Sequence, residues 1–242
     1  EYCCTNANNR YKDLSKEDIK TIVENIKLFK PKKIVITGGE PMIREDFFDI
    51  IYFIRENYSG EIQLLTNGTY ITRENVNALK IVDSISISID GYNKHMVDEI
   101  RGNGTFEKVM QSIDFLKEIN FKKIALSMVF GENNTDDINK FINFCKVKNV
   151  KSVCRFFSRF GRGKSLDTYI KNKEISFLPL ALINKDEYIE KTINCNPGNL
   201  QLFVNYDGMV YPCQNLINRK FRMFNGLKLS YKEVEKIKYR EH

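Results

Sequence analysis

Cysteines offer most of the metal-binding chemistry that this sequence could perform. Only two histidines, His95 and His242, occur among its 242 residues. Ser–His–Asp triads and His-rich zinc sites are therefore nearly excluded, and a bound metal must use thiolate ligands. A disulfide framework is the weaker interpretation for a chain of this length. The six cysteines stand at positions 3, 4, 145, 154, 195 and 213.

The setting of each cysteine separates candidate ligands from core residues. Cys195 and Cys213 flank a predicted hairpin, which can present two thiolates on one side. Gly208 supplies the positive φ that the turn of this hairpin requires. By itself, the pair also fits a structural zinc half-site or two buried thiols. Cys145 and Cys154 fall in a predicted helix and a predicted strand, and we interpret both as core residues.

A second candidate site is the string Gly38-Gly39-Glu40-Pro41, which follows a short apolar strand directly. In α/β barrels, functional groups collect at the carboxyl ends of the strands. Two glycines let a ligand approach the backbone, Glu40 can accept hydrogen bonds from an ammonium group, and Pro41 fixes the exit from the turn. A Gly-Gly pair alone would fit an ordinary tight turn equally well.

Residues 84–90 read Ser-Ile-Ser-Ile-Ser-Ile-Asp, an alternation that places serines on one face of a strand and isoleucines on the other. In a barrel wrapped by helices, the isoleucines should face the helices. Ser88 and Asp90 should then face the lumen with the other serines. Because structural barrels fill their lumen with bulky apolar side chains, this polar stripe predicts a bound polar ligand. The alternative is an exposed edge strand.

These side chains need an α/β framework, and the pattern over the first 160 residues predicts one. Helical and strand patterns alternate, which favours parallel strands. A preceding strand would have to lie upstream of Glu1. A hairpin is predicted around Tyr206-Asp207-Gly208, followed by a lysine-rich amphipathic helix. The predicted strands are 33–37, 62–66, 84–90, 124–129 and 150–157, and the predicted helices are 15–29, 44–57, 73–80, 106–118 and 136–148.

Composition narrows the class of protein. The content of hydrophobic residues, 42%, is that of a globular protein. No apolar run is long enough for a transmembrane helix, and no secretory leader is visible, so we expect a cytoplasmic protein without a membrane partner. The net charge is +7, but basic and acidic residues are interleaved along the chain. This favours a solvated surface over a nucleic-acid groove.

Taken in order, the motifs resemble those of radical S-adenosylmethionine (SAM) enzymes. The Gly38–Pro41 string resembles the GGEP motif, which holds the amino group of the methionine part of SAM. Tyr2-Cys3 resembles the end of the C-x₃-C-x₂-C loop that binds a [4Fe–4S] cluster. By this resemblance Cys3 is a cluster ligand and the first two cysteines lie upstream of Glu1. Cys4 has no assigned role.

The resemblance also assigns residues to SAM binding. Ser88 and Asp90 are similar to the family segment near the ribose and methionine parts of SAM. The string from Ile100 to Phe106, which precedes a helix, resembles an arginine-containing family segment. This implies that Arg101 contacts the SAM carboxylate; a surface ion pair is the alternative. Thr66 and Asn67 resemble the motif at the end of the third strand, and Ser127 is a weaker candidate for the lumen.

The resemblance implies a partial (β/α)6 barrel with a small cysteine-bearing extension. Residues 1–160 would form the partial barrel, 161–194 a connection, and 195–242 an incomplete SPASM or twitch-like region. Cys195 and Cys213 would then bind an auxiliary iron–sulfur cluster. No cysteine follows Cys213, which departs from a full SPASM domain.

The activity implied is reductive cleavage of SAM at the [4Fe–4S] cluster, followed by hydrogen abstraction from a substrate. The leading hypothesis is a maturase that acts on a peptide or protein side chain and receives electrons from a flavodoxin or ferredoxin. The alternatives are a small-molecule enzyme, either a twitch-type dehydrogenase or a cyclase of the molybdenum-cofactor type, and a non-catalytic iron–sulfur or zinc scaffold. No residue is indicated as the catalytic acid or base.

Overall fold

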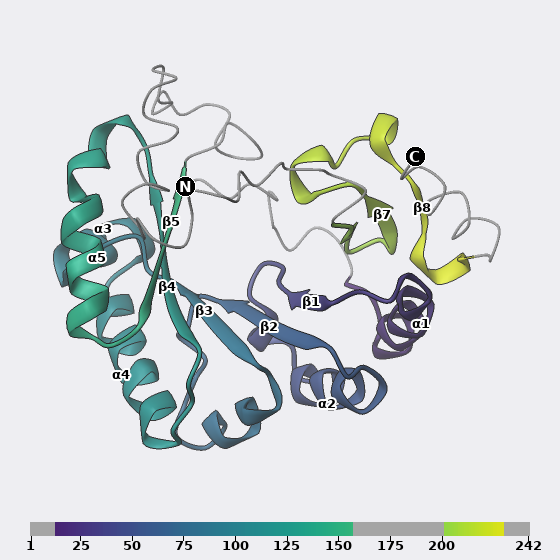
Figure 1. Cartoon of the computed structure of the whole chain (residues 1–242), viewed down its shortest axis with the longest axis horizontal. Coiled ribbons are helices and arrows are strands. Elements are labelled where there is room, and N and C mark those ends of the chain that lie inside the picture. Colours follow the sequence, from purple (N-terminus) through teal and green to yellow (C-terminus); the bar gives the residue numbers. More distant parts are fainter. Residues whose placement is uncertain (1–12, 157–200, 230–242) are drawn as a thin grey trace.

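The computed structural model describes residues 13–156 and 201–229, and its main feature is a curved parallel sheet (Figure 1). The strands are adjacent in chain order, from β1 to β5. All four neighbouring pairs are parallel, so each connection returns outside the sheet. This confirms the predicted α/β class. The strands are β1 (Lys33–Ile36), β2 (Glu61–Thr66), β3 (Ser84–Ser88), β4 (Ile124–Phe130) and β5 (Lys151–Phe156).

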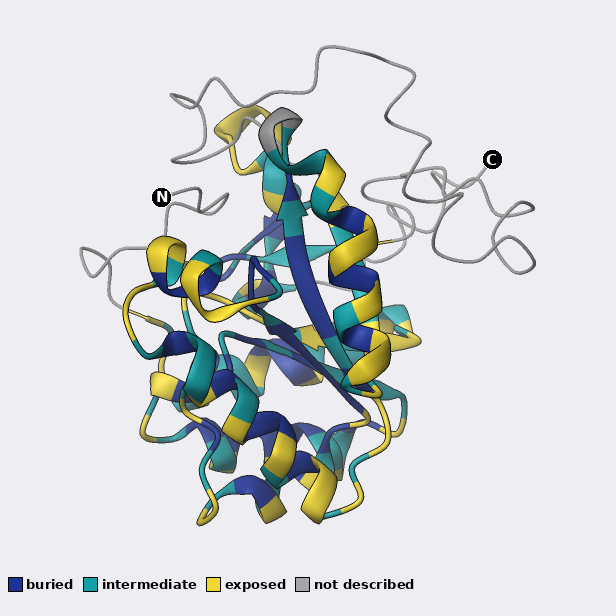
Figure 2. Ribbon diagram, turned by 90° about the vertical axis from the view of Figure 1, so that its left-hand side faces the viewer, coloured by how far each residue is buried: buried dark blue, intermediate teal, exposed yellow. Residues whose placement is uncertain are grey.

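Helices cover the outer, convex side of this sheet (Figure 1). Their buried residues lie on the side that faces the strands (Figure 2). This packing forms one apolar core between helices and sheet, and each fully buried Ile or Leu in it contributes about 1.5–3 kcal/mol. The helices are α1 (Lys16–Ile26), α2 (Phe47–Asn57), α3 (Lys94–Arg101), α4 (Thr105–Glu118) and α5 (Ile138–Val147).

Strand β3 lies at the centre of the described sheet, so the alternative of an exposed edge strand is wrong. Ile85, Ile87 and Ile89 are fully buried in the core on the helix side, as predicted. The serines occupy the opposite, concave face. The Ser86 side chain is 3% exposed, and within the described residues its hydroxyl has no hydrogen-bond partner.

The start of α1 follows its sequence signal. Ser15 and Asp18 form a reciprocal capping box, in which the Ser15 hydroxyl accepts from the Asp18 amide at 3.1 Å. The α-helix ends at Ile26, and a 3₁₀ turn extends it to Phe29 before Lys30 turns left-handed with φ 48°. The predicted helix over 15–29 is therefore correct in extent, with its last turn tighter.

The structure differs from the sequence expectations at two local elements. The segment predicted as a helix over 73–80 is a 3₁₀ helix, Val76–Ile81, and just before it the Asn75 side chain accepts from the Thr72 amide. Helix α3 was not expected, because a helix of two turns carries little periodicity. The Asn93 side chain caps it by accepting from the Met96 amide at 3.0 Å. Arg101 thus ends one helix as well as preceding another.

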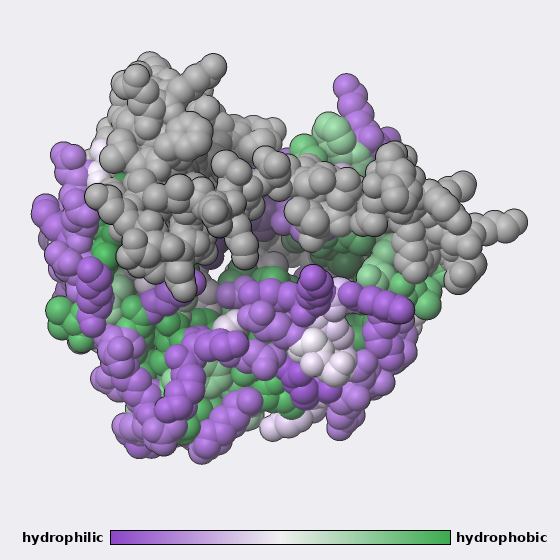
Figure 3. All heavy atoms as spheres, viewed as in Figure 1, coloured by the Kyte–Doolittle hydropathy of each residue, from purple (hydrophilic) through white to green (hydrophobic). Residues whose placement is uncertain are grey.

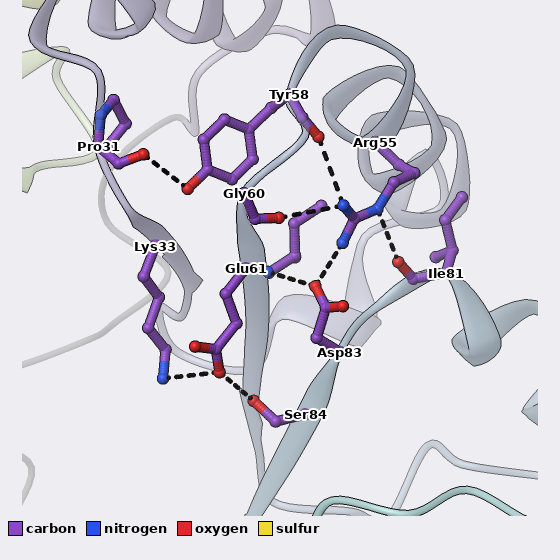
Figure 4. Close-up of polar contacts among 10 residues, drawn as sticks. Pro31, Lys33, Arg55, Tyr58, Gly60, Glu61, Ile81, Asp83 and Ser84 are labelled. Carbon is purple, nitrogen blue, oxygen red and sulfur yellow. Dashed lines mark hydrogen bonds and ion pairs between the residues drawn. The ribbon is translucent and has the colours of Figure 1, made fainter.

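Polar contacts close the amino end of the sheet (Figure 4). Arg55 donates to the carbonyls of Ile81 and Gly60, both at 3.1 Å, and to the Asp83 carboxylate. Asp83 also accepts from the Ile62 amide at 2.7 Å. These bonds tie the end of α2 to the starts of β2 and β3. Beside them, on the concave face, Lys33 pairs with Glu61 at 3.1 Å, and Glu61 accepts from Ser84.

A second, antiparallel sheet contains β6 (Phe203–Val204), β7 (Met209–Tyr211) and β8 (Phe224–Asn225). The predicted hairpin is confirmed: Gly208 has φ 75° and donates to the Asn205 carbonyl at 2.9 Å. The third strand, β8, was not predicted. The predicted connection over 161–194 and the lysine-rich terminal helix lie outside the described residues.

The second sheet packs on α1 (Figure 1). Asn25 of α1 donates to the Gly226 carbonyl at 2.7 Å. The Phe29 and Phe224 rings stack with centroids 5.6 Å apart. Residues at opposite ends of the chain are therefore held together. On the face seen in Figure 1, hydrophilic residues cover much of the described surface (Figure 3). None of the described helices is both long and apolar enough to cross a membrane.

Candidate functional site

The predicted site residues of β1 and β2 meet at the carboxyl edge of the sheet. Glu40 follows β1, and its two carboxylate oxygens reach across to the end of β2. Oε1 accepts from the Thr66 hydroxyl at 2.7 Å, and Oε2 accepts from the Asn67 amide at 2.6 Å. Oε1 also accepts from the Met42 amide at 3.2 Å, which caps the 3₁₀ turn Pro41–Ile43. Glu40 is thus the rigid link between the two predicted motifs.

The loop that precedes Glu40 is open. Thr37, Gly38 and Gly39 are exposed, and a Cβ atom added at Gly38 would meet nothing within 4 Å. Neither glycine has a positive φ, so the backbone here does not require glycine for its conformation. What the glycines provide is an uncovered backbone at the carboxyl end of β1, which a ligand can approach closely.

The turn after β2 is held from both sides. The Thr66 hydroxyl accepts from the Gly68 amide at 3.0 Å, and Gly68 has φ 80°. On the helix side, the Ser112 hydroxyl of α4 donates to the Gly68 carbonyl at 2.6 Å. A Cβ at Gly68 would lie 2.7 Å from the Ile87 side chain, so this position needs glycine for both space and conformation.

Ser112 is a site-supporting residue that the sequence analysis missed. A serine on the buried face of an amphipathic helix, between Val109 and Ile113, was the available signal. Most buried hydroxyls have a partner, and the partners of Ser112 include the turn that carries Asn67.

Asp90 and Arg101 form a buried ion pair at the end of β3. The Asp90 side chain is 3% exposed and that of Arg101 is 25% exposed. Arg101 Nη2 donates to Asp90 Oδ2, while Oδ1 accepts from the Val129 amide of β4 at 3.0 Å. Within the described part of the chain, Arg101 Nε is enclosed and lacks a hydrogen-bond partner.

Asp98 is the second supporting residue that was missed. Its carboxylate accepts from the Phe106 and Gly104 amides, both at 3.0 Å, and so fixes the Gly-Asn-Gly loop that follows Arg101. These backbone donors lower the pKa of the Asp98 carboxyl. An acidic residue in the last turn of a short helix, followed by two glycines, was the sequence signal.

Ser88 and Ser127 are direct neighbours on the concave face. Ser88 of β3 pairs with Ser127 of β4, and Ser86 pairs with Ala125 one row closer to the amino end. Ser127 is buried, and its carbonyl accepts from the Ile89 amide at 2.9 Å. The structure therefore gathers Glu40, the end of β2, Ser88, Ser127 and the Asp90–Arg101 pair along one edge of four adjacent strands.

The cysteines divide as follows. Cys3 and Cys195 lie outside the described residues. Cys213 follows β7, and its Sγ accepts from the Asn215 amide at 3.3 Å. Burial raises the pKa of Cys145 to about 12 and that of Cys154 to about 11, and both pack in the core, as predicted. Among residues 13–156 and 201–229, no three His, Cys, Asp or Glu side chains are placed to hold a metal ion.

Comparison with known proteins gives a consistent result. The family model described as the radical SAM superfamily matches residues 1–145. GTP 3',8-cyclase of Pasteurella multocida (strain Pm70) is 32% identical over 193 residues, covering 76% of this chain and 56% of that protein. Mycofactocin maturase MftC of Mycobacterium tuberculosis (strain ATCC 25618 / H37Rv) is 27% identical over 237 residues, covering 89% and 60%. The chain spans little more than half the length of these relatives.

Two solved structures share the fold. SuiB of Streptococcus suis bound to its precursor peptide SuiA superposes with a TM-score of 0.73 and 15% identity, over 96% of this chain and 62% of that chain. The protein anSMEcpe with bound AdoMet superposes with a TM-score of 0.72 and 20% identity, over 96% and 75%. At these identities the likeness concerns the fold, and it supports the predicted partial barrel.

Proposed function

Because the chain belongs to the radical SAM superfamily, whose enzymes use SAM and a [4Fe–4S] cluster, we propose that it binds SAM along the carboxyl edge of β1–β4 and acts on a peptide or protein side chain. The observation that best supports this proposal is that an open glycine loop and a fixed guanidinium both lie at the carboxyl edge of the sheet. The Gly38 backbone is uncovered, and the Arg101 guanidinium is held by Asp90 with 25% of its side chain exposed.

The residues at this edge fit the charged methionine part of SAM. Glu40 already accepts three hydrogen bonds, and a carboxylate has about four lone-pair sites, so it can accept one more from an ammonium group. Arg101 can bind a carboxylate. We propose that the site also includes Gly39, Pro41, Thr66 and Asn67, and that Ser88 and its neighbour Ser127 contribute hydroxyls.

Cys3 is proposed as one ligand of the [4Fe–4S] cluster. When bound, this cluster and SAM supply one-electron cleavage of a carbon–sulfur bond and abstraction of a hydrogen atom. The protein contributes by holding SAM at a fixed edge and by lining the adjacent concave face with small polar side chains. We further propose that Cys195 and Cys213 bind an auxiliary cluster, and that a flavodoxin or ferredoxin delivers the electrons.

The peptide class of substrate is supported by two comparisons. One curated relative is a mycofactocin maturase, and one solved structure with this fold holds a precursor peptide. A second candidate is a small-molecule enzyme, favoured by the 32% identity with a GTP 3',8-cyclase. We place the maturase first because the superpositions on SuiB and anSMEcpe each cover 96% of this chain, whereas the match to the cyclase covers 76%.

The proposal is tested by anaerobic reconstitution of the full-length protein with iron and sulfide, followed by SAM and dithionite. We expect 5'-deoxyadenosine to form, and Glu40→Ala to lower its rate of formation about tenfold or more, because positioning of SAM is lost. Glu45→Ala is the matched control, since Glu45 is exposed on the next turn and should leave the rate unchanged.

Absence of 5'-deoxyadenosine from the wild-type protein with an assembled cluster would contradict the proposal and favour a non-catalytic scaffold. The substrate class is tested in the same assay. Product from a short peptide encoded beside the gene supports the maturase, whereas product from GTP supports the small-molecule candidate.

A further inference from the structure

Asp90 was expected to contact the cofactor, but both of its carboxylate oxygens are already bonded within the protein. Oδ2 accepts from Arg101 and Oδ1 from the Val129 amide. With its side chain 3% exposed, Asp90 has little surface left for a ligand. Its carboxylate instead joins the ends of β3, α3 and β4.

The backbone at Asp90 departs from the strand to make this possible. Its φ is 55°, in the left-handed region, where residues other than glycine are uncommon and Asp and Asn are the best tolerated. The next residue, Gly91, allows α3 to pack closely, since a Cβ there would lie 2.9 Å from side-chain atoms of Met96 and Val97. The chain thus turns sharply and brings Arg101 back over the end of the strand.

Arg101 is constrained from its other side as well. The Asp98 carboxylate fixes the loop at Gly104 and Phe106, and the Gly102 amide donates to the Asp98 carbonyl at 2.9 Å. The guanidinium is therefore held by Asp90, and the backbone that follows Arg101 is held by Asp98. Its Nε is enclosed and has no partner in the described residues, so a ligand can approach only the 25% of the side chain that stays exposed.

We infer that Asp90 is a positioning residue: it orients the partly exposed Arg101 guanidinium toward the α-carboxylate of the bound sulfonium amino acid. The inference rests on the proposed SAM site. It makes Asp90 a determinant of carboxylate recognition that does not touch the ligand, because a guanidinium fixed in advance loses less entropy on binding. A free Arg101 side chain would have to be ordered by each ligand that binds.

The test uses two ligands that differ in the amino-acid part. S-Adenosylhomocysteine carries the α-carboxylate, and 5'-methylthioadenosine lacks it. Binding of each to the reconstituted full-length protein is measured by calorimetry for the wild type, Asp90→Asn, Arg101→Gln and the double variant. Asn suits the left-handed backbone and its Oδ1 still accepts from the Val129 amide, so Asp90→Asn removes mainly the contact with Arg101.

We expect Asp90→Asn to weaken S-adenosylhomocysteine binding about tenfold and to leave 5'-methylthioadenosine binding unchanged. The double variant should bind no more weakly than Arg101→Gln alone, because Asp90 acts through Arg101. Asp114→Asn, on the exposed side of α4, is the matched control and should match the wild type with both ligands.

Equal weakening for both ligands, or additive losses in the double variant, would overturn the inference while leaving the SAM site intact. The same conclusion follows if Asp90→Asn binds both ligands as the wild type does. If Asp90→Asn does not fold, an unaltered preference for S-adenosylhomocysteine in Arg101→Gln overturns the inference, and a lost preference supports it. Failure of the wild type to bind either ligand would instead overturn the proposed function, and the inference with it.

Discussion

At the scale of single residues, the two core cysteines differ in chemistry from the candidate ligands. A thiolate is the form that binds metal and reacts with alkylating agents. Burial holds the pKa of Cys145 at about 12 and that of Cys154 at about 11, so both remain thiols at neutral pH. Their conversion to ligands would require opening of the core between α5 and β5.

We therefore predict that iodoacetamide at about pH 8 leaves Cys145 and Cys154 unmodified in the native, cluster-free protein, and modifies both after unfolding in urea. Peptide mass spectrometry gives the extent of labelling at each position. Cys213, which does not pack against the core between helices and sheet, serves as the internal control and should be labelled in the native state. Rapid native labelling of Cys145 would show that this part of the core opens readily.

Residue types alone predicted much of the candidate site, but not its connections. The alternation in β3 placed Ser88 on the concave face, because strand geometry fixes which side chains share a face, whereas Asp90 lies beyond the end of the strand. The partners of Asp90 could not be predicted in this way. They depend on α3, whose eight residues carry too little periodicity, and on the amide of Val129, which lies 39 positions away.

At the scale of elements, the amino end of the sheet depends on one charged contact. Burial alone would raise the pKa of Asp83, but the Ile62 amide and the Arg55 guanidinium outweigh it and lower that pKa. A carboxyl whose pKa is lowered by folding stabilises the native state above its unfolded pKa. That contribution is lost as the pH falls through the folded value.

We predict that Asp83→Asn lowers the free energy of unfolding near pH 7, and that the gap from the wild type narrows as the pH falls below about 4. The introduced amide side chain keeps an oxygen for the Ile62 amide, so the change isolates the charge. Urea denaturation at about pH 7 and about pH 3.5 measures the gap. If the difference in the free energy of unfolding stays constant over this range, packing and not charge explains the effect. The control Asp114→Asn should have the same free energy of unfolding as the wild type at both pH values.

The same scale explains where element prediction succeeded. Predictions from signals within four or five residues are confirmed. Examples are the Ser15–Asp18 capping box and the Asp207-Gly208 turn. The short strand β8 was missed because its pairing is with β7, and two residues carry no alternation. Strand identity there is decided by tertiary contact.

At the scale of the whole molecule, the second sheet is attached through α1. The bond from Asn25 to the Gly226 carbonyl and the stacking of Phe29 on Phe224 link elements about 200 positions apart. Gly226 fits closely, since a Cβ there would lie 3.2 Å from the Gly208 carbonyl and 3.4 Å from Ile22. This contact sets where the Cys213 segment lies relative to the barrel.

We predict that Asn25→Ala lowers the free energy of unfolding by about 1 kcal/mol, because the partly buried Gly226 carbonyl loses its donor. Glu24→Ala is the control, because the ion pair of Glu24 with Lys27 lies at the surface. It should lower the free energy of unfolding by less than about half of the loss in Asn25→Ala. Limited proteolysis should cut the Asn25→Ala protein faster within residues 201–229. Equal cleavage of both variants would show that the hydrogen bond does not hold the second sheet.

The position of this attachment has a consequence for the order of assembly. Neighbouring strands of the parallel sheet are also consecutive in the chain, so the ordering entropy of bringing each pair together is small. The patch formed by Ile22 and Asn25 of α1 and by Phe29 of the following 3₁₀ turn finds its partner only after Phe224 and Gly226 have been synthesised. During translation that patch stays bare while the barrel is already forming, and chaperones have their longest opportunity to bind there.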